Sequence, residues 1–175
     1  MDEFHETGAS ARQTESQNTE VRVEPASAIL KAALRQLLTI YLDELAVAEG
    51  VPPRPRDADG HAAYRWFDDY WVDASRTPLA IWVGDDLAGF CLLRDADTHW
   101  QVSEFFVAPC HRRRGIGSTA VTAIKHFCRA GGKHAHLEAS TLSWNEPALC
   151  FWRSQGFETV SETPERLSNV FHLSP

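Results

Sequence analysis

The segment from Val107 to Ser118, with the sequence VAPCHRRRGIGS, has the composition of a phosphate-binding turn. Gly115 and Gly117 leave no side chain where a backbone must approach a ligand closely. The pattern that follows predicts an amphipathic helix whose free N–H groups and positive dipole end point toward this turn, so a diphosphate would fit there. Cationic donors beside the glycines come from Arg112, Arg113 and Arg114. Taken alone, such a glycine pair more often forms only a turn.

A second segment further along the chain adds specificity to the first. From Asn145 to Phe157 the residues follow N-x-x-A-x-x-F-W-x-x-x-G-F, again between a predicted strand and a predicted helix. Together the segments resemble the GNAT superfamily of acyl-CoA-dependent N-acetyltransferases, whose pattern is V-x-P-x-x-R-x-x-G-x-G followed by N-x-x-A-x-x-F-Y-x-x-x-G-F. The matching positions are Val107, Pro109, Arg112, Gly115, Gly117, Asn145, Ala148, Phe151, Gly156 and Phe157. The runs EFFV and FWR look like those of a subgroup of uncharacterised bacterial members.

The resemblance implies where acetyl-CoA would bind. Backbone N–H groups from Arg113 to Thr119 would hold its pyrophosphate, and Asn145 would touch the cofactor arm. Val107 would present backbone groups to the pantetheine arm and the thioester carbonyl, where the two central strands of the family splay apart. The full set of implied cofactor-binding residues is Phe106, Val107, Arg112, Arg113, Arg114, Gly115, Ile116, Gly117, Ser118, Thr119, Asn145 and Trp152.

Trp152 is a departure from the family pattern, which has a tyrosine able to protonate the leaving thiolate at this position. An indole N–H donates a hydrogen bond but is far too weak an acid to give up its proton. Because a thiol titrates near pH 8.5, roughly, coenzyme A already leaves tolerably as the thiolate. The substitution is therefore expected to slow the chemistry without forbidding it.

A general base is also required, because a primary ammonium with a pKa of about 10.4 must lose a proton before it attacks a thioester. Glu104 is the first candidate, since it lies three residues before Val107. Glu138, on the strand that precedes Asn145, is the second. Family members also place bases a little earlier on the central strand, but Gln101 and Ser103 are not bases. Each glutamate could equally be an exposed strand residue or an ion-pair partner.

An acidic and aromatic cluster precedes the predicted hairpin. Its members are Asp68, Asp69 and Asp73, with Tyr70 and Trp71 beside them. The resemblance places part of the acceptor site in this region, so the cluster could receive a cationic amine through charge and cation–π contact. The simpler interpretation is a solvated acidic helix face.

Composition limits the classes of partner. The 175 residues contain 17 lysines and arginines against 24 acidic residues, for a net charge of −7 that would repel nucleic acid and anionic membranes. The same balance favours cationic acceptors such as polyamines, aminoglycoside-like amines or lysine side chains. No apolar run approaches the roughly 18 residues that a membrane helix needs. The acidic start of the chain does not resemble a secretory signal, so a cytoplasmic location is expected.

Cysteines and histidines give no metal site. The four cysteines, at positions 91, 110, 128 and 150, form no CxxC pair and are expected to be reduced. His134 and His136 share strand spacing, which supplies half of a metal site, and nothing nearby completes it. We therefore expect no metal, and the resemblance implies acetyl-CoA as the co-substrate.

The hydrophobic pattern predicts an α/β fold with a mixed, mostly antiparallel sheet of about seven strands flanked by helices. Residues 1–19 are expected to form a flexible tail, and residues 20–175 one GNAT-like domain. Strands are expected over 21–25, 79–83, 87–93, 100–107, 134–139, 157–160 and 167–173. Helices are expected over 30–45, 61–71, 115–131 and 145–155, with a proline-rich surface loop over 50–60.

Two alternatives to an N-acetyltransferase of small-molecule or protein amines stay open. The first is a catalytically weak CoA-binding regulatory or partner-binding module, suggested by Trp152. The second is a nucleotide-phosphate-binding protein of another fold that uses Arg112 to Gly117 as an anion loop. A homodimer is compatible with the resemblance, because dimers are common in the family.

Overall fold

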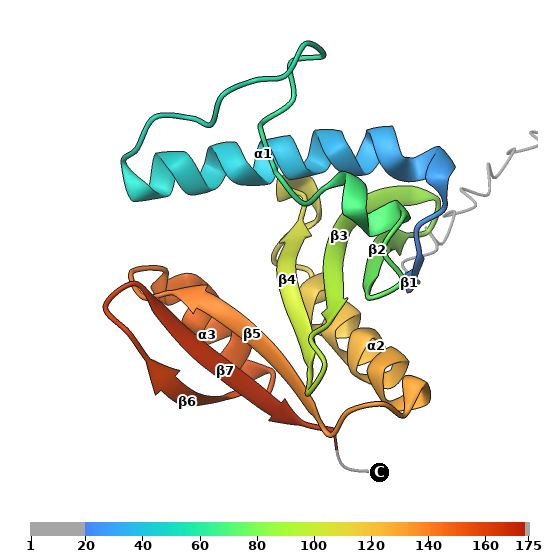
Figure 1. The fold of residues 1–175 in the computed structure, drawn as a ribbon, viewed down its shortest axis with the longest axis vertical. Coiled ribbons are helices and arrows are strands. Elements are labelled where there is room, and N and C mark those ends of the chain that lie inside the picture. Colours follow the sequence, from blue (N-terminus) through green and yellow to red (C-terminus); the bar gives the residue numbers. More distant parts are fainter. Residues whose placement is uncertain (1–19, 174–175) are drawn as a thin grey trace, which may run out of the picture.

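The computed structural model describes residues 20–173, so the tail predicted for residues 1–19 lies outside the described residues. Within these residues the chain forms three α-helices and seven strands, coloured in chain order in Figure 1. The helices are α1 (Lys31–Glu49), α2 (Ile116–Gly131) and α3 (Glu146–Ser154). The strands are β1 (Val21–Pro25), β2 (Arg76–Val83), β3 (Asp86–Asp95), β4 (Trp100–Val107), β5 (His136–Leu142), β6 (Glu158–Glu162) and β7 (Arg166–His172).

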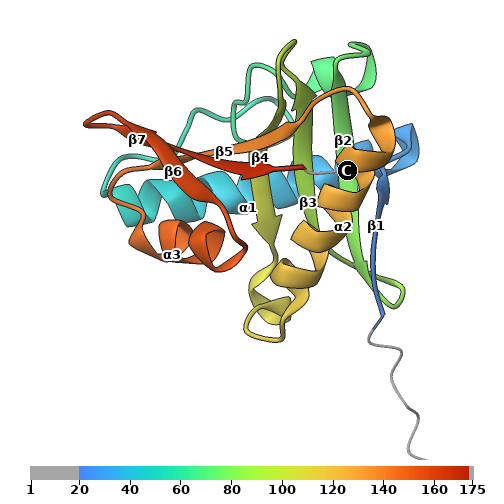
Figure 2. The ribbon, with the colours of Figure 1, turned by 90° about the horizontal axis from the view of Figure 1, so that it is seen from below.

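All seven strands belong to one sheet with the order β1-β2-β3-β4-β5-β7-β6. Neighbouring strands are antiparallel except for β4 and β5, which are parallel. Strand β1 lies at one edge of the sheet and the β6–β7 hairpin at the other (Figure 2). The predicted fold class, a mixed and mostly antiparallel sheet with flanking helices, is confirmed.

The parallel pair β4 and β5 stays together over a short distance only. Its ladder runs from Trp100 opposite Leu137 to Val102 opposite Ala139, whereas β4 continues to Val107 and β5 to Leu142. Beyond the ladder the two strands diverge into a V (Figure 1). Their facing backbone N–H and C=O groups are therefore free to bind another partner there.

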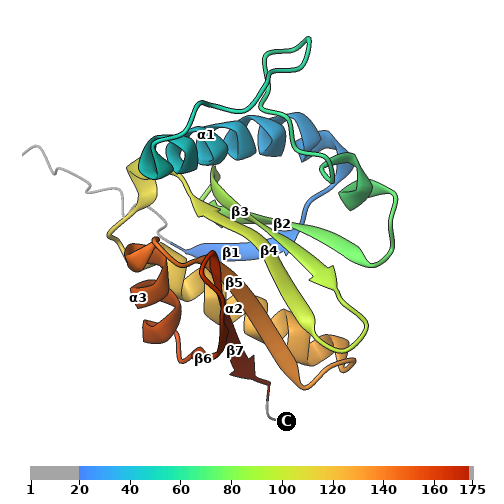
Figure 3. The same ribbon diagram turned by 60° about the vertical axis from the view of Figure 1, so that its left-hand side comes forward.

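Helices cover both faces of the sheet (Figure 3). On one face, α1 buries Leu34, Leu38 and Leu42, which recur every four residues and so share one side of the helix. On the other face, α2 buries Val121 and Ile124 against the sheet, and α3 packs beside β5. The sheet is thus the middle layer of three.

One extra residue in β4 decides which face Glu104 occupies. The register between β3 and β4 shifts so that Ser103 has no opposing residue, which is a β-bulge. Val102 packs into the core on the α2 side, and strict alternation would place Glu104 on that side as well. The bulge turns Glu104 to the opposite face, where it interacts with Tyr41 of α1.

The helix predicted over residues 61–71 is wrong for most of its length. Only Asp68–Trp71 form a short 3-10 helix. The preceding loop folds back on itself, because Ala63 N–H donates to the Pro55 carbonyl at 2.8 Å and Arg56 bridges to Ala62. These cross-loop bonds occupy the backbone groups that a helix would have used.

Candidate functional site

A cavity of about 1080 Å³ lies between the diverging ends of β4 and β5. The second half of α1, the turn before α2, and α3 complete its walls. Helix α1 crosses the open end of the V (Figure 1). The predicted site residues that line the cavity are Glu104, Phe106, Val107, Arg112, Arg113, Gly115, Ile116, Gly117, Ser118, Asn145 and Trp152. Arg114, Thr119 and Glu138 do not line it.

The turn before α2 forms one end of this cavity. Arg113 and Gly115 both have positive φ, 62° and 77°, and α2 begins immediately after them. A non-glycine residue adopts this conformation at a cost of about 1 kcal/mol or more, which is typical of ligand-binding turns. Thr119 N–H already bonds to the Gly115 carbonyl at 3.1 Å. The N–H groups of residues 116–118 have no acceptor within α2 and are available to an anion.

Gly117 lies against aromatic rings, where no side chain would fit comfortably. A Cβ atom at this position would come within 3.3 Å of the Phe151 ring. That ring stacks on Phe105 of β4, with 5.7 Å between centroids and an interplanar angle of 16°. The absence of a side chain therefore lets the first turn of α2 approach β4 and α3 closely.

Arg112 connects the end of β4 to α1. Its Nε donates to the Val107 carbonyl and its Nη2 to the Glu44 carboxylate, each at 2.7 Å. The guanidinium also lies over the Phe106 ring, 5.1 Å from its centroid. Two of its five donors are thus occupied, and the remaining ones face a half-open surface.

Glu104 projects into the cavity from β4 with its side chain largely removed from solvent. Burial raises the pKa of this carboxyl, because the charged form is disfavoured away from water. Hydrogen bonding to Tyr41 and Tyr64 and the charges of Arg54 and Arg166 lower the pKa and offset part of this effect. Burial also raises the pKa of both tyrosines, so they stay protonated as donors.

Glu138 lies outside the cavity, on the paired part of β5. Ser168 donates to its Oε1 at 3.1 Å, and His99 Nε2 lies 3.5 Å from its Oε2. These contacts tie β5 to β7 and to the loop before β4. The structure therefore separates the two glutamates that the sequence proposed as bases.

Trp152 is a buried wall of the cavity. Its ring meets Phe105, Phe151 and Phe157 edge-on, at centroid distances of 5.5, 5.2 and 4.9 Å. Asn145 precedes α3 and caps it, because its Oδ1 accepts the Ala148 N–H at 3.2 Å. Both residues thus stabilise the walls of the cavity, independently of any contact with a ligand.

The acidic residues before β2 form ion pairs and hydrogen bonds on the protein surface. Asp68 forms an ion pair with Lys31 at 2.8 Å, and Asp73 bonds to Ser75 and Arg76. Asp68, Asp69 and Asp73 do not line the cavity. The solvated-face interpretation fits these contacts better than an acceptor site does.

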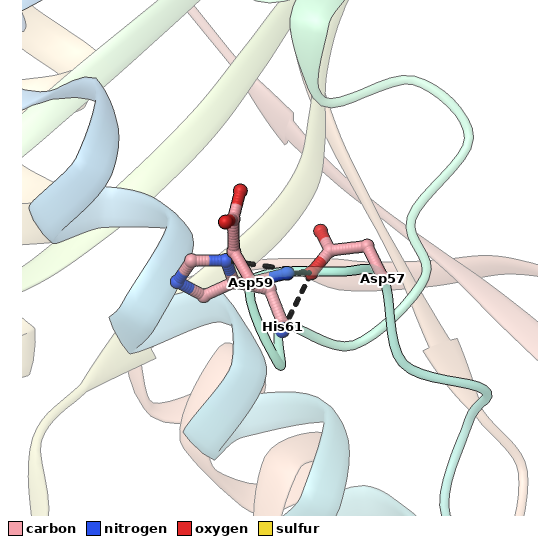
Figure 4. A group of neighbouring side chains, drawn as sticks. All are labelled: Asp57, Asp59 and His61. Carbon is pink, nitrogen blue, oxygen red and sulfur yellow. Dashed lines mark hydrogen bonds and ion pairs between the residues drawn. The ribbon is translucent and has the colours of Figure 1, made fainter.

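Asp57, Asp59 and His61 bring three potential ligand atoms within 4.8 Å of one another (Figure 4). However, Asp57 Oδ1 accepts the backbone N–H groups of Asp59 and His61 at 3.1 and 2.8 Å. Its other oxygen lies 3.3 Å from the Arg35 guanidinium. These bonds lower the pKa of Asp57 and account for the cluster as a side-chain-stabilised turn.

Four residues around Glu104 escaped the sequence-based site prediction, namely Tyr41, Arg54, Tyr64 and Arg166. Tyr41 belongs to the predicted apolar face of α1, and nothing in that periodicity separates a core tyrosine from a cavity tyrosine. Arg54 lies in the proline-rich loop and Arg166 begins β7. Only the fold brings them together.

Curated relatives match part of the chain. Streptothricin acetyltransferase of Streptomyces lavendulae is 33% identical over 85 residues, 47% of this chain and 44% of that protein. An uncharacterized N-acetyltransferase of Bacillus subtilis, YsnE, is 28% identical over 81 residues, 45% of this chain and 54% of that protein. The chain thus spans about half the length of the curated relatives it matches. No helix within residues 20–173 is long and apolar enough to cross a membrane.

Solved structures match more of the chain at lower identity. An acetyltransferase from Thermus thermophilus gives a TM-score of 0.70 at 18% identity, over 89% of this chain and 99% of that chain. A putative acetyltransferase from Salmonella typhimurium, solved with acetyl-CoA, gives a TM-score of 0.63 at 13% identity. The match covers 89% of this chain and 95% of that chain. Residues 33–157 match the model of the acetyltransferase (GNAT) family. With the splayed strands and the turn before α2 in place, the chain belongs to the GNAT acetyltransferase family.

Proposed function

We propose that the protein is an N-acetyltransferase that moves the acetyl group of acetyl-CoA directly to a primary amine. One observation carries the proposal. A single cavity joins the turn before α2 to the half-buried carboxyl group of Glu104. A group held at the turn and an amine held at Glu104 would therefore share one enclosed space, as direct transfer requires.

The chain's own groups suit acetyl-CoA at the turn end. The N–H groups of residues 116–118 and the cation of Arg113 favour a pyrophosphate, and Gly117 leaves space beside them. Past Val102 and Ala139 the unpaired strand edges offer backbone partners to an amide-containing arm. When bound, acetyl-CoA supplies an acetyl group activated as a thioester.

Glu104 is suited to take the proton that the amine must lose. A primary ammonium has a pKa of about 10.4, and a carboxyl group whose pKa is raised is a better match for it than an ordinary glutamate. The ammonium first gives one proton to Glu104, directly or through a water. The free amine then forms the N–C bond, the C–S bond breaks, and the second proton of the nitrogen passes to solvent or to the departing thiolate. Trp152 can donate a hydrogen bond but cannot protonate the thiolate.

The acceptor class follows from the family and stays broad. Relatives carry names such as streptothricin acetyltransferase and aminoglycoside 6'-acetyltransferase, which are enzymes of small-molecule amines, and ribosomal-protein-S18-alanine N-acetyltransferase, an enzyme of a protein amine. The acceptor of this chain is accordingly an amine of a small molecule or a protein. A cytoplasmic location, a homodimer and the domain bounds 20–175 stay predictions from the sequence.

Thiol release from acetyl-CoA across an amine panel tests the proposal. Glu104→Gln is expected to lower kcat by about 100-fold to 10,000-fold and to leave acetyl-CoA affinity unchanged. Glu138→Gln is the matched control, because that carboxylate lies outside the cavity, and it should retain activity within about twofold. Tight CoA binding without turnover for any amine would instead favour a catalytically weak CoA-binding module.

A further inference from the structure

The charges that line the cavity differ in sign from the chain as a whole. The chain carries a net charge of −7. The charged residues that line the cavity are Arg54, Arg112, Arg113 and Arg166 against Glu44, Glu49 and Glu104. Four solvent-exposed arginines thus outnumber three glutamates along the lining, and the overall charge does not describe the ligand that the cavity selects.

The four arginines divide between the two ends of the cavity. Arg112 and Arg113 belong to the turn before α2, and Arg112 is already bonded to Glu44. Arg54 and Arg166 come from the loop after α1 and from the start of β7, and both lie close enough to Glu104 to act on its charge. These two are therefore separate from the phosphate-binding turn.

Arg54 and Arg166 reach the surroundings of Glu104 from separate parts of the chain. The charge of Arg54 also acts on Tyr64, and that of Arg166 also acts on Tyr41. Each arginine thus stands beside one of the two tyrosines that hold the Glu104 carboxyl. A small ligand whose amine reached Glu104 would therefore lie near two guanidinium groups.

Both guanidinium groups lie near the carboxyl group of Glu104, but within residues 20–173 neither forms a close ion pair. Their neighbour Arg56, by contrast, binds Asp43 at 2.7 Å. Arg54 Nη1 makes one long contact, 3.4 Å, with the Ala63 carbonyl. The backbone N–H of Arg166 donates to Thr163 Oγ1. The side chain of Arg166 lines the cavity.

We propose that the acceptor is an amino-acid-like molecule, whose primary amine meets Glu104 while its carboxylate is held by Arg54 and Arg166. The inference rests on the proposed acetyl transfer and names its substrate class. Guanidinium groups bind carboxylates through paired, charge-assisted hydrogen bonds, so two free arginines beside a carboxyl group complement a zwitterion. A polycationic amine would instead place its further charges against the arginines, where like charges repel.

Matched pairs of amines test this directly. Thiol release from acetyl-CoA is followed with L-α-amino acids, β-alanine and 4-aminobutyrate, each beside its carboxamide, and with the polyamine spermidine. Each pair keeps the amine and removes only the anionic group. We expect kcat/KM to be at least tenfold higher for the preferred acid than for its carboxamide, and spermidine to be a poor substrate.

Variants assign the preference to the two arginines. Arg54→Gln and Arg166→Gln should each lower the acid-to-amide ratio of kcat/KM about tenfold, mainly through KM, and Arg54→Lys should restore part of it. Arg65→Gln is the matched control, because Arg65 lies in the same loop and does not line the cavity. It should leave the ratio unchanged.

The outcomes separate this inference from the function on which it rests. If carboxamides or spermidine react as well as the acids, and Glu104→Gln abolishes that turnover, the acetyl transfer stands and the amino-acid-like acceptor is overturned. If acetyl-CoA binds and no amine reacts, both proposals fail together. An acid preference that survives both arginine substitutions would refute the assignment of Arg54 and Arg166.

Discussion

The two ends of the cavity are built in different ways. The α2 end comes from one contiguous stretch, residues 107–118, and offers mainly backbone N–H groups. The Glu104 end is assembled from side chains of α1, the loop that follows it, β4 and β7. In the proposed function, the first end would bind the phosphates, a feature common to every acyl-CoA, and the varied side chains of the second would choose the acceptor.

The contrast teaches which end tolerates change. Backbone donors do not depend on side-chain identity, so the α2 end requires glycine where a side chain would intrude and permits substitution elsewhere. The Glu104 end depends on each of its side chains, because every one sets a charge or a hydrogen bond. Substitutions at the first end should therefore act on acyl-CoA binding, and those at the second on turnover and acceptor choice.

The largest effect on acyl-CoA binding is expected from Gly117→Glu. A side chain here meets the Phe151 ring at 3.3 Å, and its carboxylate would repel a pyrophosphate. Isothermal titration with acetyl-CoA should show a Kd raised by at least 100-fold, on the order of 3 kcal/mol. Thr122→Glu places the same charge on the exposed side of α2 and should change the Kd by less than about threefold. Equal effects of the two variants would contradict an anion site at the turn.

The same contrast between the two ends explains which parts of the site could be predicted from the sequence. The residues of the α2 end were predictable as a group because glycine spacing, a following helix and arginines all act locally along one contiguous stretch. The ends of two helices are local features as well: Gly132 directly follows α2, Gly156 lies two residues after α3, and both glycines have positive φ. Local patterns thus carry information about local structure.

At the Glu104 end the sequence pointed to Glu104 itself, but its neighbours could not be predicted because their arrangement is non-local. The bulge at Ser103 adds one residue to β4 and reverses the face of Glu104, and no sequence alternation announces it. Arg54 and Arg166 lie in separate parts of the chain, and only the β7 pairing and the loop after α1 bring them to one carboxyl group. The loop over 61–67 escaped prediction similarly, since its bonds run across the loop.

A pH dependence should belong to the Glu104 end alone. As a base, Glu104 acts when it is ionised, and its pKa is raised above the usual value of 4.5. Below this raised pKa, kcat should fall about tenfold per pH unit, and Glu104→Gln should lack that limb. Acetyl-CoA affinity should not follow the same curve. A limb of unchanged position in Glu104→Gln would assign the titration to another group.

The free energy of unfolding should also depend on the ionisation of Glu104, in the direction opposite to kcat. A glutamate whose pKa is raised in the folded state contributes stability at low pH and loses it as the pH rises through that pKa. At pH 8 Glu104→Gln should therefore unfold at a higher temperature than the wild type, and the difference should narrow toward pH 4.5. Glu138→Gln changes a carboxylate that contacts His99 outside the cavity, and it should show no such gain.

Trp152 stands between the two ends and can be tested with a pair of variants. Trp152→Tyr and Trp152→Phe both leave a gap beside Phe157 and should cost similar stability, about 1–2 kcal/mol. Only tyrosine supplies an acidic hydroxyl, so kcat of the tyrosine variant should exceed that of the phenylalanine variant about fivefold near pH 7. The ratio should fall toward one above about pH 9, where the thiolate needs no proton. Equal kcat values at every pH would show that this position is structural only.

The smallest effects are expected at Asn145, where a cap and a ligand contact can be separated. Asn145→Ala removes the acceptor of the Ala148 N–H and should lower the free energy of unfolding by about 1 kcal/mol. Asn145→Asp keeps an acceptor at the same position and should restore that stability. It does not keep the amide donor, so a contact between this donor and the cofactor arm would raise the acetyl-CoA Kd by about threefold in both variants. Recovery of affinity together with stability would instead limit Asn145 to its role as the cap of α3.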